Sequence, residues 1–385
     1  MRNETSRQQF GHLRSMVAAI SVLMVTTVVP AQADITYTTS WLGNTSGIPE
    51  GHIPQNITDL SVTPDGKVVT GTGWDEGGTN AAVFKNGVMI GRGLDSGTGG
   101  WGRDSNGIVA TDDKYFYFSI KQNGGYGGVP DGQSQQEIKR YNFDGTPAGF
   151  TGGIQFDHSC LNVVTSADCR NKPVVGMVAY KNELYAADSY SNTIKVYALP
   201  LASQAVTRSW AITRPGRLEV DSAGYIWMLQ PRDAANAPRL VRYSSTGELQ
   251  SQQIVFASTV EPVDFAIDRV KNRILVTNDG VDQNVLIYTN ITTAPTLSST
   301  FGDTGGIHSG TPGAVGPGKL TRPNGVGIDN AGNIYVSNNG TGLEAYSPDG
   351  KRKWELLSQL FVDAVAAVPG AETVVYGVQE RFAMD

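Results

Sequence analysis

The chain has 385 residues, a formal net charge of −6 at pH 7 and a charged fraction of only 17%. This mildly acidic composition, without a run of basic residues, argues against nucleic acid and anionic membranes as partners. The 46 glycines and the many Ser, Thr and Asn residues favour a turn-rich, all-β protein.

Residues 1–33 are predicted to be an export signal peptide that is not part of the fold. A segment with three arginines is followed by the apolar run Met16–Val29 and by Pro30-Ala31-Gln32-Ala33, which suits cleavage before Asp34. The alternative is an uncleaved membrane anchor, for which the apolar run is short. We therefore expect a secreted or periplasmic monomer, with residues 34–385 as one domain and no membrane span after signal removal.

From Ile57 to Gln379 the chain repeats a unit of short strands separated by tight turns. Each unit has a first strand, a turn rich in Asp, Asn and Gly, and a second strand of β-branched and aromatic residues. A third strand with an aromatic residue follows in six copies, at Phe84, Tyr141, Tyr197, Tyr243, Tyr288 and Tyr346. The shortest spacing between the turns, about 40 residues, is typical of a β-propeller with four strands per blade.

The clearest copy of the unit is Leu320–Leu356. Its four predicted strands are Asn324–Asp329, Ile334–Ser337, Leu343–Tyr346 and Lys353–Leu356. Four antiparallel strands of this length cannot bury both faces of their sheet, so the unit needs neighbours of its own kind.

Within this copy, RPNGVGIDNAGNIYVSNNG resembles an NHL repeat, and FGDTGGIHSGTPGAVGPGKLTRPNGVGID resembles the Gly-rich segment that often precedes one. The other copies resemble the repeat more loosely. The resemblance implies an all-β fold, a single β-propeller of four-stranded blades. It does not imply one function, because similar propellers include streptogramin lyase, the senescence marker protein and gluconolactonase group, and pure binding platforms.

The number of blades depends on how the ring closes. Ile35–Gly43 reads as a strand before the first full unit, and Thr373–Gln379 reads as the second strand of an incomplete last unit. An unpaired edge would be a liability, so we expect the N-terminal strand to complete the last blade. This arrangement has seven blades; the alternative is six, with both segments as additions.

The only two cysteines, Cys160 and Cys169, lie close together in one predicted loop. In an oxidising compartment we expect a disulfide bond between them. Free thiols, or metal ligation together with His158, are the alternatives, although the spacing does not match a zinc signature.

The two faces of the predicted disc differ in their loops. The turn face, which carries the joints between first and second and between third and fourth strands, has only short turns. The crossover face, which carries the second-to-third joints and the blade-to-blade connections, has the long insertions Lys121–Gln136, Thr151–Lys172 and Phe301–Lys319. Long loops in a compact fold often carry function, so we expect a binding site on the crossover face, around the mouth of the central channel.

The residues expected to line that mouth stand at the ends of second strands and at the entries to first strands. They are Trp74, Asp75, Glu76, Arg103, Asp188, Arg217, Asn278, Asp279, Arg322, Asn324 and Asn338.

Three of these, Asp188, Asn278 and Asn324, are candidate ligands of a Ca²⁺ ion, since oxygen ligands suit such a hard cation. This metal is implied by the similarity to gluconolactonase, but a full ligand set cannot be assigned by spacing, and no cofactor is certain. The alternative is that Asp and Asn form turns and satisfy local backbone groups.

The arginines expected at the crossovers offer donors for an anionic or sugar ligand; they are Arg103, Arg214, Arg217 and Arg322. Alternatively, they pair with Asp104, Glu219 or Asp363 between blades. Trp74 and Trp101 offer stacking surfaces or, equally, packing between blades. His158 and His308 are weak candidates for acid–base catalysis, because they lie in Gly-rich loops that do not preorganise a catalyst.

The sequence favours a secreted propeller that binds a protein or carbohydrate through its crossover face. A metal-dependent hydrolase or lyase resembling gluconolactonase or streptogramin lyase is the alternative, so whether the protein is an enzyme stays open at this stage. A purely structural array is the third possibility.

Overall fold

The computed structural model describes residue 54 and residues 57–72, 79–94, 105–123, 134–148, 156–157, 174–199, 205–312, 314–338, 342–356, 366–376 and 381–383. These residues form six four-stranded antiparallel sheets, each built from four consecutive strands, and one three-stranded sheet.

Blade 1 contains β1 (Ile57–Val62), β2 (Lys67–Thr72), β3 (Thr79–Lys85) and β4 (Val88–Leu94). Blade 2 contains β5 (Ser105–Thr111), β6 (Tyr115–Asn123), β7 (Ser134–Asn142) and β8 (Phe156–Asp157). Blade 3 contains β9 (Val174–Tyr180), β10 (Glu183–Asp188), β11 (Thr193–Ala198) and β12 (Arg208–Ala211). Blade 4 contains β13 (Leu218–Val220), β14 (Ile226–Gln230), β15 (Arg239–Tyr243) and β16 (Leu249–Val255). Blade 5 contains β17 (Pro262–Asp268), β18 (Arg273–Asn278), β19 (Asn284–Thr289) and β20 (Thr296–Phe301). Blade 6 contains β21 (Pro323–Ile328), β22 (Ile334–Asn338), β23 (Gly342–Tyr346) and β24 (Arg352–Leu356). The short 3-10 helix η1 (Gly306–His308) precedes blade 6, and β25 (Ala366–Val368), β26 (Ala371–Tyr376) and β27 (Arg381–Ala383) make the three-stranded sheet.

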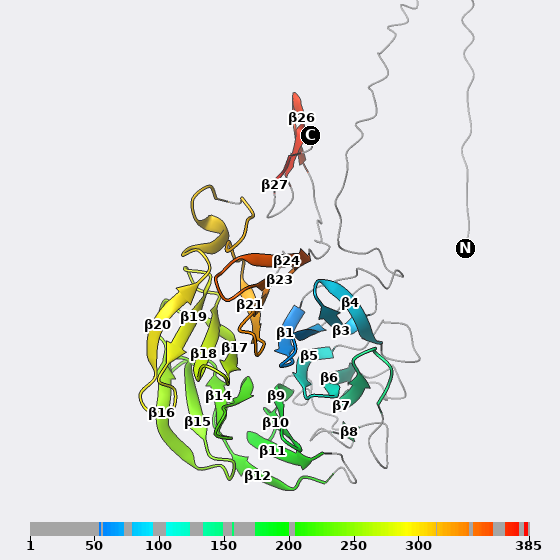
Figure 1. Cartoon of the computed structure of the whole chain (residues 1–385), viewed down its shortest axis with the longest axis vertical. Coiled ribbons are helices and arrows are strands. Elements are labelled where there is room, and N and C mark those ends of the chain that lie inside the picture. The colour runs from blue at the N-terminus through cyan, green and yellow to red at the C-terminus, as the bar shows by residue number, and fades with distance from the viewer. Residues whose placement is uncertain are drawn as a thin grey trace, which may run out of the picture. The chain divides into compact units, whose positions relative to one another are not determined.

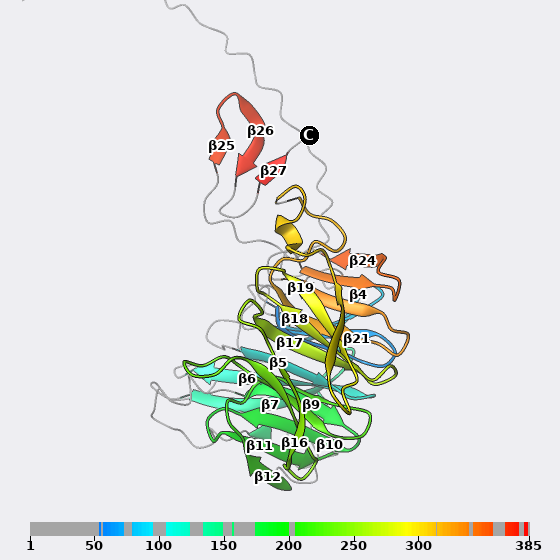
Figure 2. The ribbon, with the colours of Figure 1, turned by 90° about the vertical axis from the view of Figure 1, so that its left-hand side faces the viewer.

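The six four-stranded sheets form a closed ring, which confirms the predicted all-β propeller. The first strands β1, β5, β9, β13, β17 and β21 lie around the axis, each beside the next, and the outer strands lie at the rim (Figure 1). Figure 2 shows the same ring from the side, with β17, β18 and β19 next to one another.

The prediction of seven blades is wrong, because the described ring has six. β21 of the last blade packs directly beside β1 of the first, so the ring has no place for a composite seventh blade. The segment counted as an incomplete blade instead pairs locally, β26 with β25 and β27. Ile35–Gly43 lies outside the described residues, so the part of closure assigned to this strand is untested.

Burial is greatest in the second strands of the blades and least in the outer strands at the rim, and this difference explains the sequence pattern. All residues of β14 and β22 are buried, whereas most of those in β16 and β20 are at least partly exposed. A middle strand of a blade is covered on both faces by neighbouring blades, so it reads as a continuous apolar run without alternation.

The interfaces between the blades are filled by hydrophobic clusters. In the described residues six clusters each combine side chains of two neighbouring blades. The cluster between blades 6 and 1 includes Leu343, Tyr335, Phe84 and Leu60, with Trp354 packed against it. We call this cluster the ring seam, since it joins the last blade to the first.

An aspartate at the first tight turn of several blades organises that turn. Asp221 Oδ1 accepts hydrogen bonds from the backbone N–H groups of Ala223 and Tyr225, both at 3.0 Å, and Asp268 and Asp329 bond their own turns in the same way. These turns therefore form because the aspartate side chain satisfies turn N–H groups that no strand partner reaches.

Two of the predicted long loops contain strand pairing or hydrogen bonds of their own. β6 and β7 extend into the Gly-rich insertion as far as the pair Asn123–Ser134, because the strands keep pairing beyond the body of the blade. In the Phe301–Lys319 segment, Asp303 N–H donates to the Gly318 carbonyl at 2.7 Å, and Lys319 Nζ donates to the Ser309 carbonyl at 2.7 Å. Within the described residues no helix is long and apolar enough to cross a membrane.

Candidate functional site

A cavity of about 560 Å³ lies at the axis of the ring. Residues of blades 1 to 5 line it, mainly from the last halves of the first strands and the turns that follow them, such as Pro64, Asp113 and Lys181. Because every first strand ends at the turn face, the cavity lies on the turn-face side of the channel, away from the long insertions.

Three charged side chains meet in this cavity. Arg217 Nη1 lies 3.5 Å from Asp59 Oδ2, and its Nε lies 4.0 Å from Asp264 Oδ1. Arg217 Nη2 also donates to the Thr58 carbonyl. We call Asp59, Arg217 and Asp264 the axial triad; its members come from blades 1, 4 and 5.

The two aspartates of the axial triad hold equivalent places in their blades. Asp59 Oδ2 accepts the backbone N–H of Val109 at 2.7 Å, and Asp264 Oδ2 accepts that of Val326 at 3.0 Å. In both cases the donor belongs to the first strand of the next blade. Each carboxylate thus joins two blades through its Oδ2; toward Arg217, Asp264 presents its other oxygen, Oδ1, whereas Asp59 presents the same Oδ2.

Burial shapes the protonation of the triad, since Asp59 and Asp264 are only 5% and 3% exposed. Desolvation raises the pKa of Asp59, and the Arg217 charge opposes this rise. Desolvation raises the pKa of Asp264 well above its usual value, and the neighbouring Asp59 charge adds to the effect. The pair therefore retains a proton at a pH where free aspartates would be ionised.

Glu219 lies beside the triad, on the cavity wall. Desolvation raises its pKa to about 7, although the Arg269 charge lowers it; Arg269 Nη2 is 3.1 Å from Glu219 Oε2. The sequence alternative had one of the crossover arginines pair with Glu219 between blades; the partner found is Arg269 of blade 5, which was not among them.

This raised pKa predicts a pH-dependent stability. Below the unfolded-state pKa of about 4.3, Glu219 is protonated in both the folded and the unfolded protein, so no charge has to be buried on folding. As the pH rises from there through the folded-state pKa of about 7, the folded protein loses this advantage and becomes less stable. Relative to Glu219→Gln, the wild type should lose on the order of 3 kcal/mol of unfolding free energy across that window. Urea unfolding of both proteins at pH 4.5 and 8 measures this; a constant difference would contradict it.

Three tyrosines, Tyr115, Tyr117 and Tyr180, line the cavity. Tyr117 Oη donates to Asp112 Oδ2 at 2.7 Å, and the Arg140 guanidinium lies 4.5 Å from the centre of the Tyr115 ring. Tyr180 is half-buried and also lines the cavity. The cavity thus combines aromatic side chains with polar groups, as small-molecule sites often do.

On the crossover face, Asp188, Asn278 and Asn338 are used by local structure. Asp188 Oδ1 accepts the Tyr190 N–H at 2.8 Å, and its Oδ2 pairs with Lys195. Each asparagine ends the second strand of its blade, accepts a backbone N–H from the preceding crossover and donates to the third strand. These contacts are the turn-forming alternative that the sequence left open.

The other described candidates are also engaged. Asn324 donates to the Ile57 carbonyl of blade 1 and accepts from Ser337 Oγ at 2.9 Å. Arg322, which is exposed, has its Nε 3.6 Å from Asp279 Oδ2. Arg217 is therefore the one predicted residue, among those that the structure describes, that lines the axial cavity.

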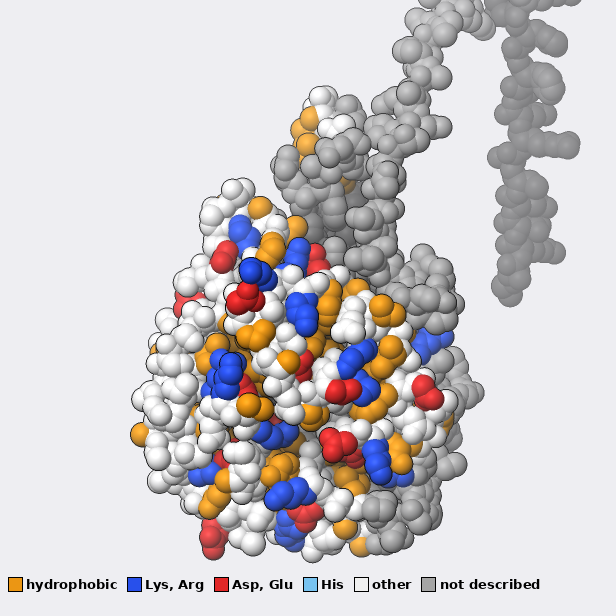
Figure 3. Space-filling model, viewed as in Figure 1, with side chains coloured by type: hydrophobic (Ala, Val, Ile, Leu, Met, Phe, Trp, Pro, Cys, Tyr) orange, Lys and Arg blue, Asp and Glu red, His pale blue; other side chains and the backbone are white. Residues whose placement is uncertain are grey.

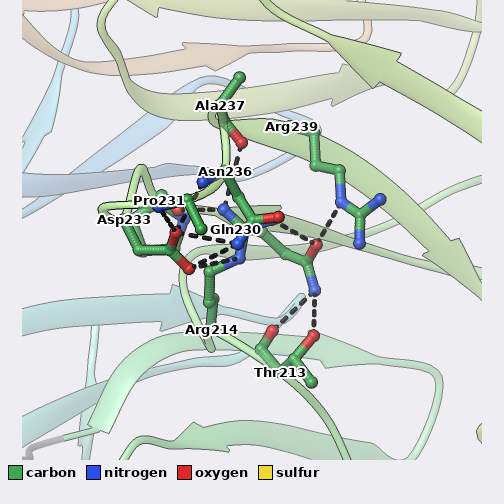
Figure 4. Close-up of polar contacts among 9 residues, drawn as sticks. Thr213, Arg214, Gln230, Pro231, Asp233, Asn236, Ala237 and Arg239 are labelled. Carbon is green, nitrogen blue, oxygen red and sulfur yellow. Dashed lines mark hydrogen bonds and ion pairs between the residues drawn. The ribbon is translucent and has the colours of Figure 1, made fainter.

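Figure 4 shows how densely the crossover side of blade 4 is bonded. Gln230 Nε2 donates to the Thr213 carbonyl at 2.7 Å, and its Oε1 accepts from Arg239 Nε at 2.6 Å. Arg214 Nε lies 3.5 Å from Asp233 Oδ2. On the face in Figure 3, basic and acidic side chains are interspersed and do not form a patch of one sign.

Several predicted positions lie outside the described residues. They are Trp74, Asp75, Glu76, Trp101, Arg103, His158 and the cysteines Cys160 and Cys169, so the disulfide bond remains a prediction. His308 is described and exposed.

The candidate calcium ligands are not brought together by any contact found for Asp188, Asn278 or Asn324. In the part of the chain that the structure describes, no group of three or more His, Cys, Asp or Glu side chains is arranged to hold a metal ion.

The sequence pattern did not lead us to predict Asp59 and Asp264 as site residues. Asp59 and Asp264 are each the third residue of a strand that is otherwise mostly apolar, in Ile57-Thr58-Asp59-Leu60 and Pro262-Val263-Asp264-Phe265. An acidic residue at a buried strand position, repeated in two blades, is the signal that could have identified them.

Comparison with known proteins shows neighbours of varied function. No family model matches the chain, and no curated protein matches it. Similar solved structures include a streptogramin B lyase (12% identity, TM-score 0.47, covering 88% of this chain and 92% of that one) and a nidogen/laminin complex (13%, 0.46, 76% and 90%). A gluconolactonase from Xanthomonas campestris is similar at 12% identity and a TM-score of 0.38, covering 70% of this chain and 90% of that one. At these values the fold assignment rests on the sheets and contacts described above.

Proposed function

We propose that the protein is an exported ligand-binding β-propeller whose ligand is a small polar molecule held in the axial cavity. The observation that carries this proposal is the convergence of the axial triad in a cavity of about 560 Å³. This volume falls within the roughly 300–1,000 Å³ of known small-molecule sites, which combine apolar walls with a few convergent polar groups. Export is inferred from the signal pattern of residues 1–33.

The crossover face has less support as the binding site. Its described candidate residues use their polar atoms in turns and crossovers, so a ligand there would have to compete with existing bonds. The axial cavity has charged groups whose hydrogen-bonding capacity is not used up. A metal-dependent hydrolase or lyase gains no support from a described cluster of ligands.

Thermal shift measurements with small polar molecules (sugars, polyols, amino acids, nucleosides and amides) test the proposal. We expect at least one compound to raise the melting temperature of the wild type. Ser61→Trp, which fills the cavity, should abolish the shift, whereas the matched Ser299→Trp on the exposed strand β20 should keep it. A shift that survives in Ser61→Trp would place the ligand elsewhere, and no shift with any compound would contradict the proposal.

A further inference from the structure

The axial triad contains a donor that the protein itself does not satisfy. Arg217 Nη1 is buried and has no hydrogen-bond acceptor among the described residues. The nearest carboxylate oxygen, Asp59 Oδ2, is 3.5 Å away and already accepts the Val109 N–H at 2.7 Å. The 4.0 Å between Arg217 Nε and Asp264 Oδ1 is also too long for a hydrogen bond.

The groups around this donor are best satisfied by a ligand group that both accepts and donates hydrogen bonds. Arg217 can only donate, whereas an ionised carboxylate can only accept. A hydroxyl group does both, so one hydroxyl can accept from Arg217 and donate to an aspartate. Two neighbouring hydroxyl groups would serve both sides of the triad.

The charges of the cavity disfavour a charged ligand. An anion would meet Asp59, Asp264 and Glu219, and a cation would meet Arg217 and Arg269. Burial also raises the pKa of both aspartates, so that a shared proton brings the triad close to neutrality. A neutral ligand avoids the cost of bringing an uncompensated charge into this buried setting.

We infer that the axial cavity takes a neutral polyhydroxylated ligand, of the carbohydrate or polyol class, whose hydroxyl groups bridge Arg217 to Asp59 and Asp264. This inference rests on the proposed function of the cavity. The half-buried side chains of Tyr115 and Tyr180 line the same cavity and add aromatic surface beside its charged groups.

The experiment is calorimetric titration at pH 7 with hexoses of gluco, galacto and manno configuration, each as the neutral sugar, the 2-amino sugar and the uronate. We expect a neutral hexose to bind at least about tenfold more tightly than its two charged forms. Asp264→Asn, which can still accept the Val326 N–H, should weaken this binding by about tenfold to a hundredfold. Asp233→Asn, the same change at an exposed site on the crossover face, should leave it unchanged.

The outcomes separate this inference from the proposed function. A charged form that binds as tightly as the neutral sugar overturns the inference, as does binding that Asp264→Asn leaves unchanged. If no neutral hexose binds but another compound binds in a Ser61-dependent way, the inference fails and the axial site stands. Should Asp264→Asn not fold, Tyr180→Ala changes another side chain that lines the same cavity. Sugar binding that is unchanged in that variant overturns the inference.

Discussion

Replacement of Asp221 with alanine should lower the free energy of unfolding by about 3–5 kcal/mol, the usual cost of breaking a buried ion pair. Asp221 is fully buried; its Oδ2 accepts a hydrogen bond from Arg242 Nε at 2.8 Å and forms an ion pair with Arg242 Nη2, also at 2.8 Å. Arg242 is itself only 5% exposed, so loss of the carboxylate leaves a guanidinium buried without a counter-ion. Trp227 Nε1, 3.3 Å from the same oxygen, loses its acceptor too.

Two further variants isolate the cause. Asp221→Asn keeps an oxygen for the turn N–H groups but removes the charge. We therefore expect it to lower the free energy of unfolding almost as much as Asp221→Ala does. Asp349→Ala removes an exposed turn carboxylate that pairs with Lys351 at 3.0 Å, and the denaturation midpoint should hardly move. Guanidinium unfolding followed by circular dichroism measures all three; an Asp221→Ala midpoint near that of the wild type would refute the ion-pair argument.

Truncation of Leu343 to alanine at the ring seam should cost about 2–5 kcal/mol of unfolding free energy. Leu343 is fully buried in the cluster that joins blade 6 to blade 1, and the truncation leaves a cavity there. Leu249→Ala is the matched control, because that leucine is 60% exposed on the outer strand β16 and should change stability by only about 0.5 kcal/mol.

The same measurement tests how the ring closes. Since β21 already packs beside β1, deletion of Ile35–Gly43 should leave the denaturation midpoint close to that of the wild type. A deletion as damaging as Leu343→Ala would instead mean that the N-terminal strand takes part in closure.

The local parts of the fold could be predicted from the sequence. The strand predicted at Ile334–Ser337 forms as β22, one residue longer, and Asp221, Asp268 and Asp329 form turns of the predicted Asp-, Asn- and Gly-rich kind. These features depend on residues a few positions apart, whose preferences a sequence pattern records directly. The blade number depends on which distant strands pack together, and the hairpin Ala366–Tyr376 has the same local pattern as half a blade.

The candidate site was harder to predict for the same reason. Arg217 was identified as a crossover residue, but its partners Asp59 and Asp264 come from blades far away in the sequence. Polar residues at strand ends looked exposed and available; Asn278 and Asn338 instead satisfy backbone groups within their own blades. Sequence spacing locates a residue on a strand, but it does not reveal which side chains meet across the axis.

The ring seam also bears on the order in which the protein folds. At the seam, Asn324 donates to the Ile57 carbonyl, a contact between residues 267 positions apart. At about 5–20 residues per second, a ribosome needs on the order of tens of seconds to make the intervening chain. Blades 1 to 5 can pack against one another as they are made. The face of blade 1 that belongs to the ring seam stays uncovered until blade 6 has been made. During synthesis the unfinished ring is therefore an open stack with an apolar surface at each end, and the last blade covers both at once.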